Sequence, residues 1–307
     1  MPGVVLLAVG AIVLGAGTAA ADDGTPWQVK TASNSYGSGR ANYAYTLAAG
    51  GQVEDAFVVV NRGKAPIDLA VYAGDAFTTA DGELDLRGAD SKDLGTWVHA
   101  DRKQVRVLPG KSVEVPFKIA VPADARPGDH LGGVITSLTQ NDVERRLAIR
   151  IRLRVSGELK PSLAVEDLTV QYSGKLLGSG DATVAYEIRN TGNTIAAARQ
   201  EASVSGPFGQ LKAKSGAIAD SPQLLPGETW KVSVPVHDVT AAGRLTAAVD
   251  LLPLVTDAAG STATFPVSKT SAHAWTIPWA LLLALVLVAA AVVLVVRRVR
   301  ATRRQAA

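Results

Sequence analysis

The 307-residue chain contains no cysteine, so no disulfide bridge can hold it together. It also has no thiol that can serve as a catalytic nucleophile. Whatever domains the chain forms must therefore be stabilised by the burial of apolar side chains alone.

Motifs of catalysis are missing as well. There is no HExxH or HxH pair to hold zinc and no G-x-S-x-G elbow. Gly63-Lys64 and Gly174-Lys175 lack the hydroxyl residue and the upstream glycine of a phosphate-binding loop. Histidine occurs four times, at scattered positions: His99, His130, His237 and His273. The sequence predicts no enzyme, no cofactor and no metal site.

One acidic stretch bears on the prediction that there is no metal site. Asp81, Glu83 and Asp85 have the one-three-five spacing of an EF-hand loop, but Leu86 stands where the loop needs Gly and Lys92 where it needs Glu. An EF-hand is thereby excluded. A solvated loop is predicted instead, with an irregular calcium site as the alternative.

One stretch near the C-terminus is devoid of charge. Ile277–Val296, IPWALLLALVLVAAAVVLVV, is long enough as a helix to cross the roughly 30 Å hydrocarbon layer of a membrane. Residues 297–307 are rich in arginine, and the bias of Lys and Arg towards the cytoplasm places this basic tail inside. The pattern predicts a single-pass type I protein of the cell membrane with the bulk of the chain extracellular. A buried hairpin of two apolar helices is the alternative.

The N-terminus matches that orientation. Val4–Gly17 is apolar, and the small residues Ala19 and Ala21 fit a signal-peptidase site, so residues 1–21 are predicted to be a signal peptide. An uncleaved N-terminal anchor is the alternative. The formal net charge of +3 includes five arginines of the C-terminal tail, so it gives no support to a nucleic-acid partner.

Between Ala41 and Val267 apolar residues recur at every second position, interrupted by Gly, Pro, Asn and Asp. In the run Ser112–Val121, for example, one side of an extended chain carries Val113, Val115, Phe117, Ile119 and Val121. No segment between the two termini offers a convincing amphipathic helix. This part of the chain is therefore predicted to be all-β, with antiparallel sheets buried on one face.

A repeated pattern sets the number of domains. Asn61–Gly63 and Asn190–Gly192 each follow an apolar alternation, and a Leu-Pro-Gly turn comes later in each unit, at Leu108–Gly110 and Leu225–Gly227. Pro and Gly at the centre of a turn suit a type II turn that leads into a strand. Two such units predict two tandem immunoglobulin-like β-sandwiches. Their predicted ranges are 22–157 and 158–270.

Two features of the first unit invite a functional interpretation. It carries a longer insertion, Gly74–Trp97, and long surface loops often carry function. The alternation from Leu147 to Val155 places Arg150, Arg152 and Arg154 on the outward face of one strand. Guanidinium groups in a row can bind the carboxylates or phosphates of a wall polymer, and the alternative is that Asp or Glu on neighbouring strands pairs with them.

Several stretches between Trp27 and Leu252 carry a family resemblance. They are Tyr43–Leu47 before Gly50-Gly51, Val71–Ala76, Asp81-Gly82, Gly95–Trp97, Val121–Gly133, Arg152–Gly157 and Asn190–Asn193. Together they resemble the WxL-interacting protein family of Gram-positive cell surfaces, membrane-anchored proteins with two immunoglobulin-like domains. The run P-A-D-A-x-P-G-D-H-x-G-G within Val121–Gly133 is the most specific of them.

The resemblance implies that the first domain binds peptidoglycan and that the second binds a host protein or a WxL-domain partner. The literal W-x-L of this chain, Trp279–Leu281, lies in the apolar C-terminal stretch, so a WxL partner would be another chain. Gly132 and Gly133 allow a close approach, either by a glycan or by the ring of Trp97.

The sequence as a whole predicts a non-catalytic cell-surface protein that binds peptidoglycan or another wall polymer, a WxL-type surface protein, or both. The alternative is an extracytoplasmic scaffold subunit of a membrane or export complex that does not bind glycan. The candidate ligand-binding residues are Trp97, His130, Gly132, Gly133, Arg150, Arg152 and Arg154.

Overall fold

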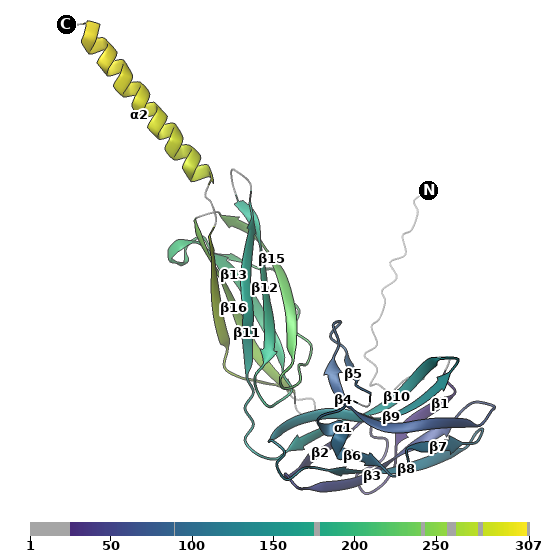
Figure 1. Cartoon of the computed structure of the whole chain (residues 1–307). Helices are drawn as coiled ribbons and strands as arrows, with labels where there is room; N and C mark the ends of the chain where they lie inside the picture. The colour runs from purple at the N-terminus through teal and green to yellow at the C-terminus, as the bar shows by residue number, and fades with distance from the viewer. Residues whose placement is uncertain are drawn as a thin grey trace, which may run out of the picture.

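The computed structural model describes residues 25–88, 90–174, 179–240, 243–256, 262–275 and 279–305. Up to Trp275 the described chain is almost entirely β-structure, arranged as two sandwiches (Figure 1). The prediction of an all-β fold built from β-sandwiches is confirmed. The predicted signal peptide, residues 1–21, lies outside the described residues.

The first sandwich packs a four-stranded sheet against a six-stranded one. The four-stranded sheet has, in spatial order, β1 (Trp27–Thr31), β3 (Gln52–Asn61), β8 (Ser112–Ala120) and β6 (Val98–Ala100). The six-stranded sheet has β2 (Tyr43–Leu47), β10 (Val143–Val155), β9 (Gly128–Gln140), β4 (Ile67–Thr78) and β5 (Leu84–Leu86), with β7 (Gln104–Val107) also paired to β4. A single helical turn, α1 (Leu94–Trp97), precedes β6.

The second sandwich has the same two-layer plan. One sheet contains β11 (Leu163–Ser173), β12 (Ser179–Asn190) and β15 (Thr229–Thr240). The other contains β14 (Ala213–Lys214), β13 (Ala197–Ser205), β16 (Arg244–Thr256), β17 (Thr262–Thr264) and β18 (Ser268–Trp275), the last two both paired with β16. A short 3₁₀ turn, η1 (Pro207–Gly209), follows β13.

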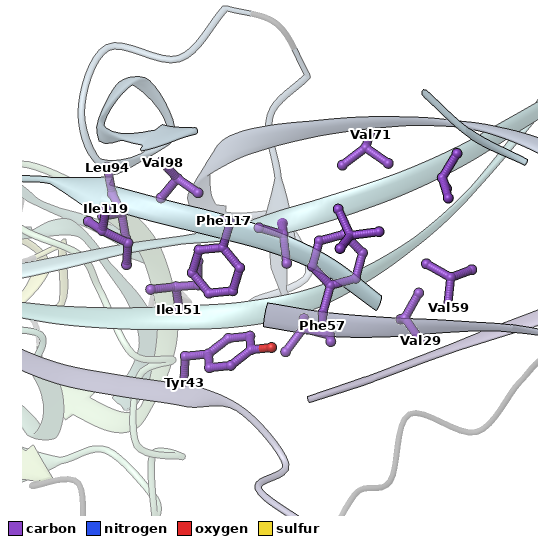
Figure 2. Close-up of a cluster of buried hydrophobic side chains, with 14 of the residues drawn as sticks. Val29, Tyr43, Phe57, Val59, Val71, Leu94, Val98, Phe117, Ile119 and Ile151 are labelled. Carbon is purple, nitrogen blue, oxygen red and sulfur yellow. The ribbon is translucent and has the colours of Figure 1, made fainter. Parts of the chain in front are cut away.

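Inward-facing residues of both sheets fill the core of the first sandwich. Figure 2 shows Tyr43, Phe57, Phe117 and Ile151 pointing towards one another, and each is at most 1% exposed. These residues obey the period-two alternation of strands, which sends every second side chain to the same face. The indole of the fully buried Trp27 donates a hydrogen bond from Nε1 to Thr136 Oγ1 at 2.9 Å, which joins the two sheets.

The second sandwich has a separate core of the same kind. It is built mainly from the apolar faces of β12, β13, β15 and β16. Tyr186 is buried within it, and its hydroxyl donates a hydrogen bond to Gln200 Oε1 at 2.7 Å. Burial raises the pKa of Tyr186 to about 12, so this hydroxyl stays a neutral donor.

The repeated asparagine has the same role in both sandwiches. Asn61 and Asn190 are fully buried, and each side-chain amide donates to two carbonyl oxygens, those of Ala65 and Val107 for Asn61. Each side-chain oxygen accepts the amide of the glycine two residues later. Because each asparagine fastens its own turn to the segment before the Leu-Pro-Gly turn, the sequence repeat corresponds to a structural repeat.

The helix α2 (Trp279–Gln305) follows the second sandwich. Among the described residues, no helix has the length and hydropathy that crossing a membrane requires. This contradicts the predicted transmembrane helix at 277–296 and the predicted localisation as a type I protein of the cell membrane. The sequence prediction treated the apolar run and the basic tail 297–307 as separate parts, whereas α2 continues from one into the other.

Candidate functional site

The edge of β10 is only partly covered. On one side β10 pairs with β9 from Val143 to Val155. On the other side β2 pairs with Ile151–Val155 alone. Within the described part of the chain, no strand pairs with Val143–Arg150 on that side. This segment is an unpaired strand edge about 26 Å long at roughly 3.3 Å per residue.

The edge is open because the chain changes sheets. Residues 32–42, rich in Ser, Gly and Asn, carry the chain from β1 in the four-stranded sheet to β2 in the six-stranded sheet. Gly37 and Gly39 have positive φ angles of 120° and 63°, which suit a tight crossover. The residues that precede β2 therefore lie in the opposite sheet and leave the rest of β10 uncovered.

A buried ion pair fixes this crossover. Asp55 on β3 has a fully buried side chain, and Arg40 binds its two carboxylate oxygens at 2.7 and 3.0 Å. Asn34 and the Tyr45 hydroxyl donate to the same carboxylate at 2.6 and 2.5 Å. The guanidinium group also lies 5.1 Å from the centre of the Tyr43 ring. A carboxylate with this many donors holds the crossover loop in one conformation.

The protonation states of this cluster follow from burial and these contacts. Burial by itself raises the pKa of Asp55, but the hydrogen bonds from Arg40, Tyr45, the Ala56 amide and Asn34 outweigh it and hold the pKa below its ordinary value. Burial, and then the hydrogen bond to Asp55, raise the pKa of Tyr45. Asp55 is therefore a carboxylate and Tyr45 a neutral donor at neutral pH.

The open edge of β10 borders a groove of about 1420 Å³. One wall comes from the four-stranded sheet and the crossover loop, the other from β10, β9 and the end of β4 with β5. The lining from the first wall includes Gln28–Thr31, Val58, Glu114 and Arg40. The lining from the second wall includes Ala76, Leu84, Leu86, Ile135, Arg146, Ala148 and Arg150. The groove thus mixes apolar surface with charged groups along an unpaired backbone.

Residues Thr78–Arg87, named the flap from here on, form part of the second wall. The flap folds back over the outer face of the six-stranded sheet, where a Cβ atom on Gly133 would lie 2.7 Å from Leu86 Cδ1. Arg146 on β10 donates to the Leu86 carbonyl oxygen at 3.3 Å and lies 3.7 Å from Asp85. The predicted surface insertion Gly74–Trp97 thus contains this flap and α1.

Asp75 organises the rest of that insertion. It is 7% exposed, and its carboxylate accepts backbone amides from Lys92, Asp93 and Gly95 at 2.6, 2.9 and 2.6 Å. Its own amide donates to Ser91 Oγ at 3.0 Å. Among the residues that the structure describes, no group of three or more His, Asp or Glu side chains is arranged to hold a metal ion.

The three arginines predicted on the outward face of one strand have two different kinds of surroundings. Arg150 is exposed and lines the groove. Arg154 binds Asp129 with two hydrogen bonds of 2.7 and 3.0 Å, and Arg152 binds it at 3.2 Å. Arg152 and Arg154 therefore have an acidic partner on a neighbouring strand, as the alternative interpretation predicted.

Asp129 also joins the two sandwiches. It is 3% exposed, and its carboxylate accepts the amide of Ile195 in the second sandwich at 3.1 Å. Burial alone raises the pKa of Asp129, but Arg154, the Ile195 amide and Arg152 outweigh it and keep the pKa below its ordinary value. The carboxylate is charged at neutral pH and links β10 to the second sandwich.

The other predicted ligand residues contact the chain itself. His130 Nδ1 lies 2.7 Å from Asp93 Oδ2, and its Nε2 lies 3.1 Å from the Arg126 carbonyl oxygen. The Trp97 ring packs on His130 with 4.7 Å between ring centres. Burial lowers the pKa of His130, but the hydrogen bond to Asp93 and the charge of Asp93 outweigh it, so the net pKa is raised.

The two glycines make room for neighbouring backbone. A Cβ atom on Gly132 would lie 2.5 Å from the Gly74 carbonyl oxygen, and one on Gly133 would lie 2.7 Å from the Ile149 carbonyl oxygen. Neighbouring atoms therefore do approach both glycines closely, as predicted, but these atoms belong to β4, β10 and the flap. The ring of Trp97 lies against His130 instead.

Sequence reasoning missed the residues that shape the groove. Asp55 places a charged residue at a buried position of the strand Gln52–Asn61. A charge among apolar strand residues indicates a buried ion pair, and this was the one feature of the sequence that could have predicted it. Asp75 and Arg40 gave no comparable signal, because their partners are backbone amides and a distant strand. The open edge itself depends on strand pairing, which the sequence did not specify.

Comparison with known proteins finds similar solved structures but no family. No family model and no curated protein matches the chain. A structure described as a chaperone–tip adhesin complex of CFA/I fimbriae is similar over 80% of this chain and 99% of its own, at 10% identity and a TM-score of 0.42. The class 5 fimbriae chaperone CfaA is similar over 82% and 99%, at 10% identity and a TM-score of 0.36. The E. coli chaperone DraB is similar over 80% and 95%, at 10% identity and a TM-score of 0.35.

These findings correct the family prediction. The resemblance to the WxL-interacting proteins is contradicted, since no family model matches and the three similar structures just described are those of fimbrial chaperones. The predicted binding of peptidoglycan or wall polymer, the WxL-type partner, and the membrane-bound surface or scaffold role are corrected with it. Asp129, His130, Gly132 and Gly133, which carried the resemblance, all have packing or hydrogen-bonding roles within this chain. The fold and the site together define a β-sandwich protein with an open strand edge.

Proposed function

We propose that this chain is a non-catalytic, chaperone-like protein that binds an extended segment of a partner protein along the open edge of β10. The partner segment adds to the six-stranded sheet as a further strand beside Val143–Arg150 and fills the groove. The observation that carries the proposal is the coincidence of this edge with the groove. Strand addition to an exposed sheet edge is a recurrent mode of polypeptide recognition.

The length and lining of the site support this mode. The edge accommodates a segment of the usual strand length, about five to six residues. Each backbone hydrogen bond gains about 0.5–1.5 kcal/mol net, whereas ordering one residue costs about 1–2 kcal/mol. Backbone pairing is therefore insufficient alone, and apolar side chains of the partner must pack on Val29, Val58, Leu84 and Leu86.

Two of the similar structures are complexes of a fimbrial or pilus chaperone with a tip adhesin or tip adhesion subunit. That is a property of those proteins, and at about 10% identity it leaves the proposal here dependent on the edge of β10. The absence of catalysis is part of the proposal. We also propose that the two sandwiches are separate domains, the first at 22–157 and the second from 158 to Trp275, because β18 extends the second sandwich beyond the predicted boundary at 270.

A displayed library of random peptides of about ten residues tests the proposal, because peptides of that length span the edge. The full chain is used as bait, and hydrogen exchange then maps the bound peptide. Peptides of alternating apolar and polar residues should be enriched, and they should protect the amides of Val143–Arg150 while leaving the edge strand β15 unchanged.

Two alanines on the outer face of the same sheet provide a matched pair of variants. Ala148 lines the groove, whereas Ala44 on β2 is equally exposed and lies outside it. Ala148→Trp should abolish peptide binding and Ala44→Trp should leave it intact. Enrichment that is the same for Ala148→Trp and the unchanged protein, or no enrichment at all, would reject the proposal.

A further inference from the structure

We infer that Glu228 of the second sandwich is a positioning residue that holds the flap and thereby sets one wall of the groove in the first sandwich. The inference rests on the proposed function only for what occupies the groove. The contact between Glu228 and the flap is independent of any ligand.

Glu228 binds the first residue of the flap. Its Oε1 accepts the Thr78 amide at 3.0 Å, and its Oε2 lies 2.7 Å from Thr78 Oγ1. The Thr78 hydroxyl is also 3.0 Å from the Gln223 carbonyl oxygen, so its single hydrogen has an acceptor from the second sandwich in either orientation. Hydrogen bonds to a charged acceptor are worth about 1.5–3 kcal/mol each.

The carboxylate of Glu228 is oriented by its own turn before it meets the flap. Oε2 accepts the Leu225 amide at 3.0 Å, and the Glu228 amide donates to the Leu225 carbonyl oxygen at 3.0 Å. The equivalent turn of the first sandwich has the same backbone hydrogen bond, from Lys111 to Leu108, but an exposed lysine in place of the glutamate. The acceptor is thus present in the repeat that faces the flap.

Apolar contacts follow the same path. The buried side chains of Ala76 and Leu131 cluster with Ile195 and Leu225 of the second sandwich, and Leu84 and Leu86 of the flap pack against this cluster. At the flap tip, a Cβ atom on Gly82 would lie 3.2 Å from Pro222 and 3.5 Å from Trp230. The second sandwich therefore contacts the flap at its start, at its tip and along β5.

Residues that contact the second sandwich also line the groove. Leu84 and Leu86 of the flap, and Ala76 just before it, belong both to the lining of the groove and to the cluster with the second sandwich. Glu228 does not line the groove. Releasing the flap from Glu228 removes a wall that a bound segment would pack on, so the second sandwich controls how the first one binds.

A thiol placed in the groove measures this directly, because the chain has no cysteine of its own. In an Ala148→Cys protein, reaction with a bulky maleimide reports access to the groove. Adding Glu228→Ala should raise the labelling rate at position 148 by about tenfold or more, the loss of two charged hydrogen bonds being sufficient for this. Thr78→Val should raise it less, since the Thr78 amide remains bound.

Two controls separate positioning from a general loss of structure. Ala44→Cys should be labelled at the same rate with and without Glu228→Ala, and Glu166→Ala, which breaks the exposed pair with Arg189, should not alter labelling at position 148. An unchanged rate at position 148 in Glu228→Ala would overturn the inference. So would an increased rate without any loss of affinity for a selected peptide. Failure of every library peptide to bind would reject the proposed function alone, since labelling needs no peptide.

Discussion

The two sandwiches share a framework and differ at one edge. In both, a buried asparagine fastens a turn and a Leu-Pro-Gly turn leads into a long strand. In the second sandwich β16 is covered by β18 from Arg244 to Leu251 and by β17 from Leu254 to Thr256. In the first, β2 covers only the end of β10.

The difference comes from where the accompanying chain is placed. In the second sandwich the last two strands lie beside β16 in the same sheet. In the first, β1 pairs with β3 in the opposite sheet, and the chain crosses over only at residues 32–42. A common framework therefore produces one sandwich in which β17 and β18 cover β16 and one in which most of β10 is left free to pair with a further strand.

The largest effect is expected for Phe117→Ala, which should destabilise the first sandwich by about 3–5 kcal/mol. Phe117 is 1% exposed and packs against Tyr43 with 5.1 Å between ring centres. Phe208→Ala in the second sandwich is the matched control, because Phe208 is 100% exposed. Urea unfolding monitored by hydrogen exchange in each sandwich checks both. Equal losses for the two variants would contradict the buried core described here.

Asn61→Ala and Asn190→Ala should each cost about 2–3 kcal/mol, and the two costs should be equal within error. Each substitution leaves two buried carbonyl oxygens and one amide without their side-chain partner. Denaturation of the two variants under identical conditions measures the difference. A large difference between the two losses of stability would show that the two asparagines do not stabilise their sandwiches equally, although the sequence pattern is shared.

Acid should destabilise the first sandwich before the second. The first buries the carboxylates Asp55 and Asp129 with lowered pKa values. A carboxylate with a lowered pKa stabilises the folded state at pH values above its ordinary pKa near 3.8. This stabilisation is lost as the pH falls through the folded-state pKa. In the described part of the second sandwich the buried polar residues are uncharged: Asn190, Thr194, Gln200 and Ser221.

Hydrogen exchange in each sandwich between about pH 6 and pH 2.5 checks that prediction. Asp129→Asn should remove part of the acid sensitivity of the first sandwich. If the second sandwich lost protection at the higher pH, the assignment of the sensitivity to these two carboxylates would be wrong.

The smallest effect is expected for the two His–Asp pairs. His130 with Asp93 has a raised pKa, so it contributes stability that is fully present below the ordinary value of 6.5 and is lost as pH rises through the folded-state pKa. His237 with Asp181 is exposed on both sides. His130→Gln should therefore flatten the stability of the first sandwich between about pH 6 and pH 8 by less than about 1 kcal/mol, and His237→Gln should change nothing. An NMR titration in which His130 titrates below 6.5 would contradict this.

The sequence predicted the parts of the fold that follow from local patterns. Alternation identified the inward faces of strands such as Ser112–Ala120, and the repeated asparagine and Leu-Pro-Gly turns divided the chain into two similar units. These signals work because period two and turn residues act over a few positions. The resemblance to a surface protein family was wrong, and two of the residues that carried it, Asp129 and Gly133, make an ion pair and a close backbone contact within this chain.

The site depended on pairing that no local pattern specifies. The alternation Leu147–Val155 correctly placed Arg150, Arg152 and Arg154 on one face, but it gave no information that Asp129 lies beside Arg154. It also gave no indication that β2 begins opposite Ile151. Strand register and the location of a crossover are tertiary properties, so the groove and the role of Glu228 appeared only with the structure.

The open edge of β10 also bears on how copies of this protein behave at high concentration. Exposed strand edges invite identical molecules to join edge to edge and aggregate. Arg145, Arg146 and Arg150 occupy this edge, so two copies that met along β10 would bring guanidinium groups of like charge together. Such repulsion disfavours fibre-like stacking of the chain with itself while leaving the edge open to a segment of another sequence.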